Sequence, residues 1–504
     1  MVETIGRCLG ETSPMKVDFV SKKTPTVGEY VYLKYNNQIV LGMIDSLFRG
    51  STTLSNDILN PETIEKILKI EGNIDHYVRG SVTILGDKDK LQIPKTPAPP
   101  GTEVIKADVE LLKEVFGRSN GIRIGSILTE PEVPVMLDVN KMVSRHLAIL
   151  AMTGSGKSNT TSIIIDQLLA IGGTMVVFDM HSEYGNAKFP NGEIKEIAPQ
   201  LNPRDLDFNE FKELAVINDN AVNQERYLRD AYEYADDLTT EGESTNFIET
   251  MESKLNSIEL ELENEGTQSE KNTVKQVLYK LNDLKRKYKK ILNSTDVADI
   301  VSILEPGKAN IIRLGSIDER ATDIIVKHVL SKILYRRKNA INNPNAETLD
   351  FPVFCIIEEA HMLASSRRGT RSKSVIGKIA REGRKFGVGL CLVSQSPKSL
   401  DSEILSQVNN MIILRLIEPG DQRHVQESSE SLSEDLLNQL PALNIGEAVV
   451  LGQMTKLPTM VKVDEFKGKT VGNDLNITDL WMKSKREREE SIKKGINDID
   501  ELGI

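Results

Sequence analysis

The stretch Ala151-Met152-Thr153-Gly154-Ser155-Gly156-Lys157-Ser158 decides the fold of this chain. It follows an apolar run, Leu147–Ala151, that we expect to be a buried strand, and it opens a predicted helix, Lys157–Ala170. Strand, glycine-rich turn and helix in this order are typical of a phosphate-binding P-loop. Gly154 and Gly156 let the backbone curl so that its N–H groups point at phosphate oxygens, while the helix N-terminus adds positive potential. The usual first glycine of the pattern is replaced by Ala151.

The loop predicts a site for ATP and Mg²⁺. Lys157 supplies a positive charge to the β and γ phosphates, and the Ser158 hydroxyl is a ligand for Mg²⁺. The other predicted nucleotide contacts in and after the loop are Thr153, Gly154, Ser155, Gly156 and Asn159.

A second apolar run, Val353–Ile357, ends in the paired acids Glu358 and Glu359. Adjacent strand residues point to opposite faces, so the two carboxylates can take different tasks. We expect Glu358 to hold the Mg²⁺ shell and Glu359 to orient and deprotonate the attacking water. The usual aspartate of this Walker B pattern is Glu358 here, which leaves the division of labour open. A plain solvated turn is the alternative.

Two further polar residues, Asp179 and Gln395, each end a predicted strand. Ligands of open α/β sheets lie beyond the carboxyl ends of the strands, so Asp179 should lie near the γ phosphate in a supporting role. Gln395 is a candidate for sensing that phosphate or holding the water, or else an ordinary polar strand end. His181 and His361 lie near the same edge but lack a spaced third ligand, so we predict no metal site there.

An arginine from a neighbouring subunit completes the site in ring-forming P-loop motors. Arg384 is the first candidate for this role in trans. The alternatives are Arg145, Arg381 and Arg415.

Two basic runs need separate interpretations. Arg367–Lys373 follows the paired acids and is spaced by Gly and Ser, so it is a candidate loop for contacting DNA phosphates, or simply a solvated loop. The run Lys285–Lys290 is interpreted as a solvated helix face.

The pattern of apolar residues divides the chain into five parts. Residues 1–136 read as a small β-barrel domain, with a helix at Pro61–Ile70. Residues 137–205 and 299–470 read as two halves of one α/β core with a parallel sheet, interrupted by a helical insertion at 206–298. Residues 471–504 form a charged tail that is either an arm docking on a neighbour or a solvated terminus. Strands are expected at Tyr30–Tyr35, Ile39–Ile44, Val78–Leu85 and Ile122–Ile127 of the barrel domain and at Thr174–Met180, Val388–Val393 and Met411–Leu416 of the core.

Two apolar stripes at helical spacing lie within the insertion, with a break at Glu265-Gly266. We interpret them as an antiparallel helical pair that packs on itself, because neither stripe lasts long enough for an intermolecular coiled coil.

The composition is that of a globular protein, with 39% hydrophobic and 27% charged residues over 504 residues. A net charge of −11 argues against a protein that coats nucleic acid with its whole surface, so any DNA-binding face must be local. The three scattered cysteines fit a reducing compartment. No run is long and apolar enough for a signal peptide or a membrane span, so we expect a soluble, cytoplasmic protein without membrane partners.

Five motifs together resemble the archaeal HerA family of the HerA/FtsK group of P-loop motors. Their order and spacing cover essentially the whole chain. They are Thr-Gly-Ser-Gly-Lys-Ser (153–158), Phe-Asp-Met-His-Ser-Glu-Tyr (178–184), Ile-Glu-Glu-Ala-His (357–361), Ile-Ala-Arg-Glu-Gly-Arg-Lys-Phe-Gly (379–387) and Ser-Gln-Ser-Pro (394–397).

The resemblance implies an α/β RecA-like core, an N-terminal barrel of the HAS type, the helical-bundle insertion and a C-terminal arm. It also implies a homo-hexameric ring that translocates along double-stranded DNA, can unwind it, and works with a NurA-type nuclease and with Mre11 and Rad50 on broken ends. Lys157 would then bind ATP, Glu359 would be the catalytic base and Arg384 the arginine acting in trans. Arg145 would match a further nucleotide-contacting arginine of the family.

Two other classes of motor stay open. A protein-directed motor, such as an unfoldase or secretion ATPase, usually grips its substrate with aromatic and apolar pore loops, whereas the loop after Glu359 is rich in arginine and has no aromatic residue. A RecA-type filament binder fits the barrel and the insertion less well.

Overall fold

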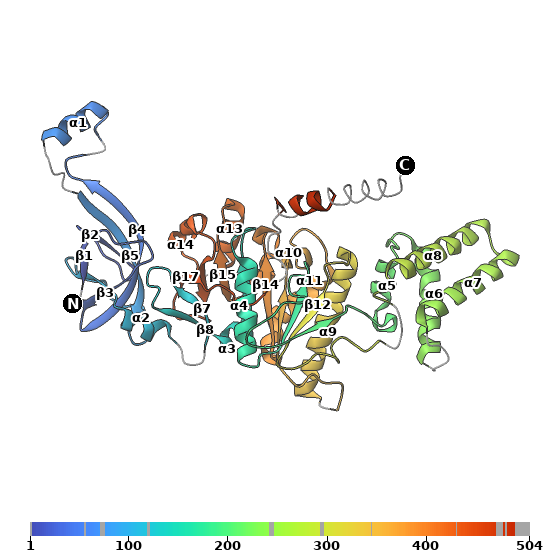
Figure 1. Ribbon diagram of the computed structural model, residues 1–504. Helices are drawn as coiled ribbons and strands as arrows, with labels where there is room; N and C mark the ends of the chain where they lie inside the picture. The colour runs from blue at the N-terminus through green and yellow to red at the C-terminus, as the bar shows by residue number, and fades with distance from the viewer. Residues whose placement is uncertain are drawn as a thin grey trace, which may run out of the picture.

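The computed structural model of the protein is elongated, with a barrel at one end, a large sheet in the middle and a helical bundle at the other end (Figure 1). Within the residues that it describes, no helix combines the length and apolar composition that a bilayer crossing requires. The described residues are 3–54, 57–70, 76–117, 121–240, 246–292, 297–343, 345–429, 431–469, 477–478 and 481–488.

The N-terminal barrel is closed, so it has no free strand edge. Its strands follow the order β1-β2-β5-β4-β3-β6 around the barrel and enclose their own apolar core. The three predicted strands at 30–35, 39–44 and 78–85 and the predicted helix α1 (Pro61–Ile70) are confirmed. Helix α1 lies at the tip of the long β4–β5 hairpin, away from the barrel (Figure 1). The strands are β1 (Thr4–Leu9), β2 (Lys16–Ser21), β3 (Tyr30–Tyr35), β4 (Gln38–Ser51), β5 (His76–Asp87) and β6 (Glu103–Lys106).

The expected strand at 122–127 is present as β7 (Gly121–Ile127), but its assignment to the barrel is wrong. β7 pairs with β8 (Pro134–Asp138) and with β17 (Thr459–Val463), so it belongs to the large sheet. Helix α2 (Val109–Phe116) follows the last barrel strand. Alternation along a strand identifies its buried face but not its partner, and here the partner lies more than 300 residues away in the chain.

The large sheet has eleven strands in the order β11-β12-β10-β13-β14-β9-β15-β16-β17-β7-β8. The first seven in this order pair in parallel, and the rest are antiparallel. Five of the parallel strands are buried along their whole length, which explains why each reads as a continuous apolar run. These five are the predicted strands β9 (Leu147–Leu150), β10 (Met175–Asp179), β13 (Val353–Ile357), β14 (Val388–Ser394) and β15 (Asn410–Leu414), and the others are β11 (Ile194–Ile197), β12 (Ala309–Arg313) and β16 (Glu447–Gly452).

Helices flank the sheet (Figure 1). The long helix α9 packs against α11, and α4 follows the P-loop as predicted. The helices of the core are α3 (Val139–Ser144), α4 (Lys157–Ala170), α9 (Glu319–Asn342), α10 (Ala360–Leu363), α11 (Arg371–Glu382), α12 (Ser402–Gln407), α13 (Pro419–Ser428) and α14 (Glu434–Gln439).

The insertion consists of α5 (Phe208–Leu214), α6 (Val222–Thr240), α7 (Phe247–Glu265) and α8 (Gln268–Lys287). The predicted pair with its break is confirmed, because α7 ends at Glu265 and a capping box of Thr267 and Glu270 starts α8. Helices α6, α7 and α8 pack together within the one chain. The basic run Lys285–Lys290 is only partly the predicted helix face, because α8 ends at Lys287 and Tyr288 is buried. Within it, Lys285 pairs with Glu252 at 3.1 Å.

The C-terminal tail is described only at 477–478 and in a helical segment, 481–488. Trp481 is 73% exposed there. The rest of the predicted arm, 471–504, lies outside the described residues.

Candidate nucleotide-hydrolysis site

The candidate site lies where four adjacent parallel strands end. The strands β10, β13, β14 and β9 are neighbours in the sheet, and each is followed by polar residues at its carboxyl end. Because parallel strands place these ends along one edge, residues from four distant parts of the chain meet there. The sequence predicted each strand end separately, and the sheet order brings them together.

The P-loop has the backbone that phosphate binding requires. Gly154 and Gly156 have φ angles of 76° and 105°, which side-chain-bearing residues rarely adopt. Beyond the Cα of Gly154 lies open space, so nothing blocks an approaching phosphate. The Ser155 hydroxyl donates to Met152 O at 2.6 Å and fixes the turn. Helix α4 begins at Lys157, so its first N–H groups are directed towards the loop.

Lys157 and Glu359 form an ion pair across the site, from Nζ to Oε1. The same carboxylate oxygen accepts a hydrogen bond of 2.5 Å from Gln395 Nε2, and the Oε1 of Gln395 accepts one of 2.5 Å from the Thr153 hydroxyl. The P-loop, Glu359 and the amide that follows β14 therefore form one connected network. Burial alone would raise the pKa of Glu359, but the hydrogen bond and charge of Lys157, with the Gln395 amide, hold it below its usual value.

Glu359 has a strained backbone. Its φ of 44° and ψ of 42° place it in the left-handed region between β13 and α10. A residue other than Gly, Asn or Asp is rare in this region, and such conformations are concentrated at functional sites. Two histidines flank its carboxylate, with His181 Nε2 at 3.5 Å from Oε1 and His361 Nδ1 at 3.4 Å from Oε2.

Glu358 directly follows β13, and it is almost completely buried. Burial, together with the neighbouring carboxylates of Asp179 and Glu183, raises the pKa of Glu358 well above its usual value. A divalent cation would favour its ionised form. The carboxylate of Glu358 and the hydroxyl of Ser158 are the oxygen donors that Mg²⁺ prefers, so the residues present fit this ion.

Asp179 and Asn159 make contacts within the chain. The Asp179 carboxylate accepts from the backbone N–H groups of Glu183 at 3.0 Å and Tyr184 at 3.1 Å, which shapes the turn after β10. Asn159 donates to Asp464 O at 2.9 Å and accepts from Phe466 N at 2.8 Å. Both polar atoms of the Asn159 side chain are thus bonded to the segment after β17. Only the backbone N–H of Asn159 could make the predicted nucleotide contact.

The candidate arginines separate into two groups. Arg145 precedes β9, and Arg384 lies in the turn Gly383–Phe386 before β14, so both are at the edge of the sheet opposite the P-loop. At ~3.3 Å per residue, these strands put about 13 to 23 Å between the two edges. Neither arginine can reach a nucleotide on its own chain. Arg381, beside them, is paired with Glu403 at 3.0 Å.

Arg415 is different because it lies at the P-loop edge. Its carbonyl accepts from Met152 N at 3.1 Å and its Nε donates to Pro441 O at 3.2 Å. Arg415 therefore lies beside the P-loop of its own chain and is a poor candidate for contacting the nucleotide of a neighbouring subunit.

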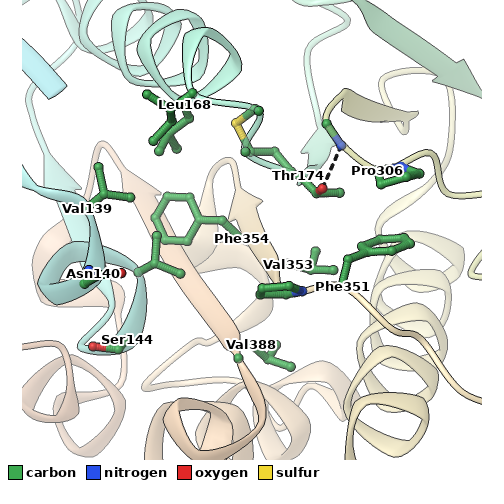
Figure 2. A pocket seen from close by; sticks show the side chains of 18 of the residues that line it. Val139, Asn140, Ser144, Leu168, Thr174, Pro306, Phe351, Val353, Phe354 and Val388 are labelled. Carbon is green, nitrogen blue, oxygen red and sulfur yellow. Dashed lines mark hydrogen bonds between the residues drawn. The ribbon is translucent and has the colours of Figure 1, made fainter. Parts of the chain in front are cut away.

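Arg384 also lines a cavity of about 440 Å³ at the opposite edge. Figure 2 shows Leu168 and Phe354 among its apolar lining residues. The edge that carries Arg384 thus contains a mainly apolar cavity with this arginine in its lining.

The basic cluster after the paired acids is only partly a loop. Arg371 begins α11 and pairs with Glu213 of the insertion, and Arg368 pairs with Glu319 at 2.9 Å. Arg367 is exposed and has no ion-pair partner among the residues that the structure describes.

Within the described residues, the one His/Asp/Glu group close enough to hold a metal ion is Asp205, Asp299 and His328, away from this edge. Its carboxylates are already paired with cations of α9, Asp205 with Lys332 at 2.8 Å and Asp299 with Arg336 at 2.8 Å. His181 and His361 do not belong to this group.

Sequence reasoning missed the contacts of two residues in the site. It considered His181 and His361 only as metal ligands, whereas the structure places both against the Glu359 carboxylate. The signal was their position, two residues after Asp179 at the end of β10 and two residues after Glu359, which follows β13.

A P-loop, paired acids and a strand-end amide along one edge of a parallel sheet define a P-loop ATPase. The family profile described as "Helicase HerA, central domain" matches residues 122–333, and the one described as "HAS barrel domain" matches residues 5–90. The chain belongs to the HerA helicase family.

Relatives support this assignment over nearly the full chain. A probable helicase of Methanocaldococcus jannaschii is 40% identical over 95% of this chain and 94% of its own length. The DNA double-strand break repair helicase HerA of Sulfolobus acidocaldarius is 39% identical over 96% of this chain and 98% of its own. Among solved structures, VirB4 of Thermoanaerobacter pseudethanolicus matches with a TM-score of 0.49 at 14% identity, over 69% of this chain and 98% of that one.

Proposed function

We propose that this protein is an ATP-driven DNA helicase and double-stranded DNA translocase that acts in the repair of DNA double-strand breaks. The names of its full-length relatives support the repair role. The connected network of Lys157, Glu359 and Gln395 supports hydrolysis rather than mere binding of ATP.

The observation that carries the proposal is the separation of the site between two edges of one sheet. The P-loop and acids lie at one edge, whereas Arg145 and Arg384 lie at the other. A second copy placed head to tail would bring its arginines to this chain's nucleotide. Heterologous contacts of this kind form a ring when the rotation between subunits closes and an open filament when it does not, and we propose a closed ring of six chains.

Each residue then has a task. Lys157 leaves Glu359 to contact the β and γ phosphates, and the freed Oε1 of Glu359 accepts a proton from the attacking water. Gln395, held by Thr153, keeps this oxygen oriented. Glu358 and Ser158 would hold Mg²⁺, which neutralises charge that develops on the phosphates.

The proposed partners are double-stranded DNA, a NurA-type nuclease at the barrel end, and Mre11 and Rad50 in end processing, in the cytoplasm. The net charge of −11 restricts DNA contacts to local basic sites, of which Arg367 is the proposed example.

The decisive experiment measures phosphate release from ATP with and without duplex DNA, together with the mass of the assembly in solution. We expect turnover to rise with duplex DNA and the mass to be that of six chains. Turnover that responds instead to an unfolded protein substrate would support a protein-directed motor and overturn the proposal.

A further inference from the structure

The two oxygens of the Glu359 carboxylate have different surroundings. Oε1 is bound by Lys157 and Gln395. Oε2 faces His361, whose Nδ1 lies 3.4 Å away. The same Nδ1 lies 3.2 Å from the hydroxyl oxygen of Ser394.

Ser394 gives His361 a rigid support. It is the last residue of β14 and is completely buried. Its carbonyl accepts from Ala151 N at 3.1 Å, and its hydroxyl accepts from Ser396 N at 3.1 Å. His361 thus connects the proposed base, which follows β13, with the end of β14 and the start of the P-loop.

The contact of His361 with Glu359 becomes important in the proposed step in which Lys157 moves to the phosphates. Glu359 then loses its strongest contact, while its strained backbone offers no help in fixing the side chain. His181 is 51% exposed on the turn after β10, whereas the His361 side chain is only 24% exposed. His361 is therefore the better anchored of the two neighbours.

We infer that His361 is a positioning residue for the proposed base: its Nδ1–H, shared between the Ser394 hydroxyl at 3.2 Å and Oε2 of Glu359 at 3.4 Å, keeps Oε1 directed at the attacking water. The inference rests on the proposed role of Glu359. Burial lowers the pKa of His361, so the ring is neutral at pH 7 and acts as a hydrogen-bond donor rather than a second cation. No proton or bond is exchanged between the two side chains.

The test compares three substitutions of one residue. Asn places an amide where Nδ1 lies, Gln extends its amide towards Nε2, and Ala has neither group. We expect His361→Ala and His361→Gln to lower kcat about tenfold to a hundredfold, the scale of a misplaced base. We expect His361→Asn to recover kcat to within about threefold of the wild type. KM for ATP and the affinity for a non-hydrolysable analogue should stay within about twofold, since no phosphate contact is removed.

Ser394→Ala is the second variant, because it removes only a hydroxyl from a buried site, and we expect kcat to fall with KM unchanged. His76→Ala, an exposed residue of the barrel hairpin, is the control for histidine loss in general. Equal losses in His361→Asn and His361→Ala, or a wild-type kcat in His361→Ala, would overturn the inference.

Glu359→Gln distinguishes the proposed base from the positioning role of His361. Continued hydrolysis in Glu359→Gln would refute the proposed base. Loss of hydrolysis there, with normal kcat in His361→Ala, would refute only the role of His361.

Discussion

Lys157 Nζ is ion-paired with Oε1 of Glu359, so the cation of the P-loop and the carboxylate of the proposed base compensate each other's charge. Both side chains are largely buried, at 11% and 4% exposure, and the pair is therefore weakly screened by solvent. In the proposed mechanism ATP displaces Glu359 from Lys157, so substrate binding is coupled to the release of the proposed base.

Glu359→Gln should separate binding from hydrolysis. The amide cannot accept the proton from water, so we expect turnover to fall at least about a hundredfold, the usual contribution of a general base. ATP should bind at least as tightly as to the wild type, because Lys157 no longer has a carboxylate partner. Phosphate release and analogue binding measure the two effects. Turnover within tenfold of the wild type would contradict the assignment of the base.

Arg384→Ala should abolish hydrolysis while leaving nucleotide binding nearly intact, because Arg384 lies at the edge away from its own P-loop. Arg381→Ala is the matched control, since Arg381 lies close by but is paired with Glu403. We expect Arg381→Ala to keep most of the activity.

Mixing subunits provides an independent test of the trans arrangement. Lys157→Ala subunits retain Arg384, and Arg384→Ala subunits retain the P-loop, so a mixed ring contains some complete sites. With equal amounts and random assembly we expect roughly a quarter of the sites to be complete. No recovered ATPase activity in the mixture would contradict a site shared between subunits.

Arg367→Ala should weaken DNA binding, because Arg367 is an exposed cation of the loop after Glu359. We expect reduced stimulation of the ATPase by duplex DNA and a slope of log affinity against log salt that is smaller by about one. Arg286→Ala, on the solvated face of α8 and paired with Asp283, is the control. Equal effects of both variants would exclude a specific role for the loop.

His146 should make stability fall in mild acid. Its Nδ1 accepts from Leu390 N at 3.0 Å and its Nε2 lies 3.1 Å from Ala380 O, so the buried ring is neutral. Burial lowers its pKa to about 4, below its value of 6.5 in the unfolded chain. Between these values the unfolded state binds a proton that the folded state does not, so stability is full above pH 6.5 and declines as the pH falls towards 4.

The expected loss from His146 is about 2 kcal/mol in the free energy of unfolding between pH 7.5 and pH 5. Denaturant unfolding at the two pH values measures it. His146→Asn, which suits the positive φ of 63°, should show a shallower pH dependence, whereas the exposed His76→Asn should not. Equal slopes for the wild type and His146→Asn would contradict the explanation.

Much of this protein was determined by local sequence. Residues 151–158 specify the P-loop because glycines at 154 and 156 are a backbone requirement within one turn. The buried parallel strands were predictable because each reads as a continuous apolar run, and the break between α7 and α8 because capping is also local.

Only the tertiary structure decided which distant segments meet. It placed β7 beside β17 instead of in the barrel, since strand pairing depends on partners that alternation cannot specify. It put Arg145 and Arg384 at the far edge of the sheet and Arg415 at the near edge. It also brought His361 between Glu359 and Ser394. Residues alone supply the chemical groups, whereas the order and direction of the strands decide which of these groups share a site.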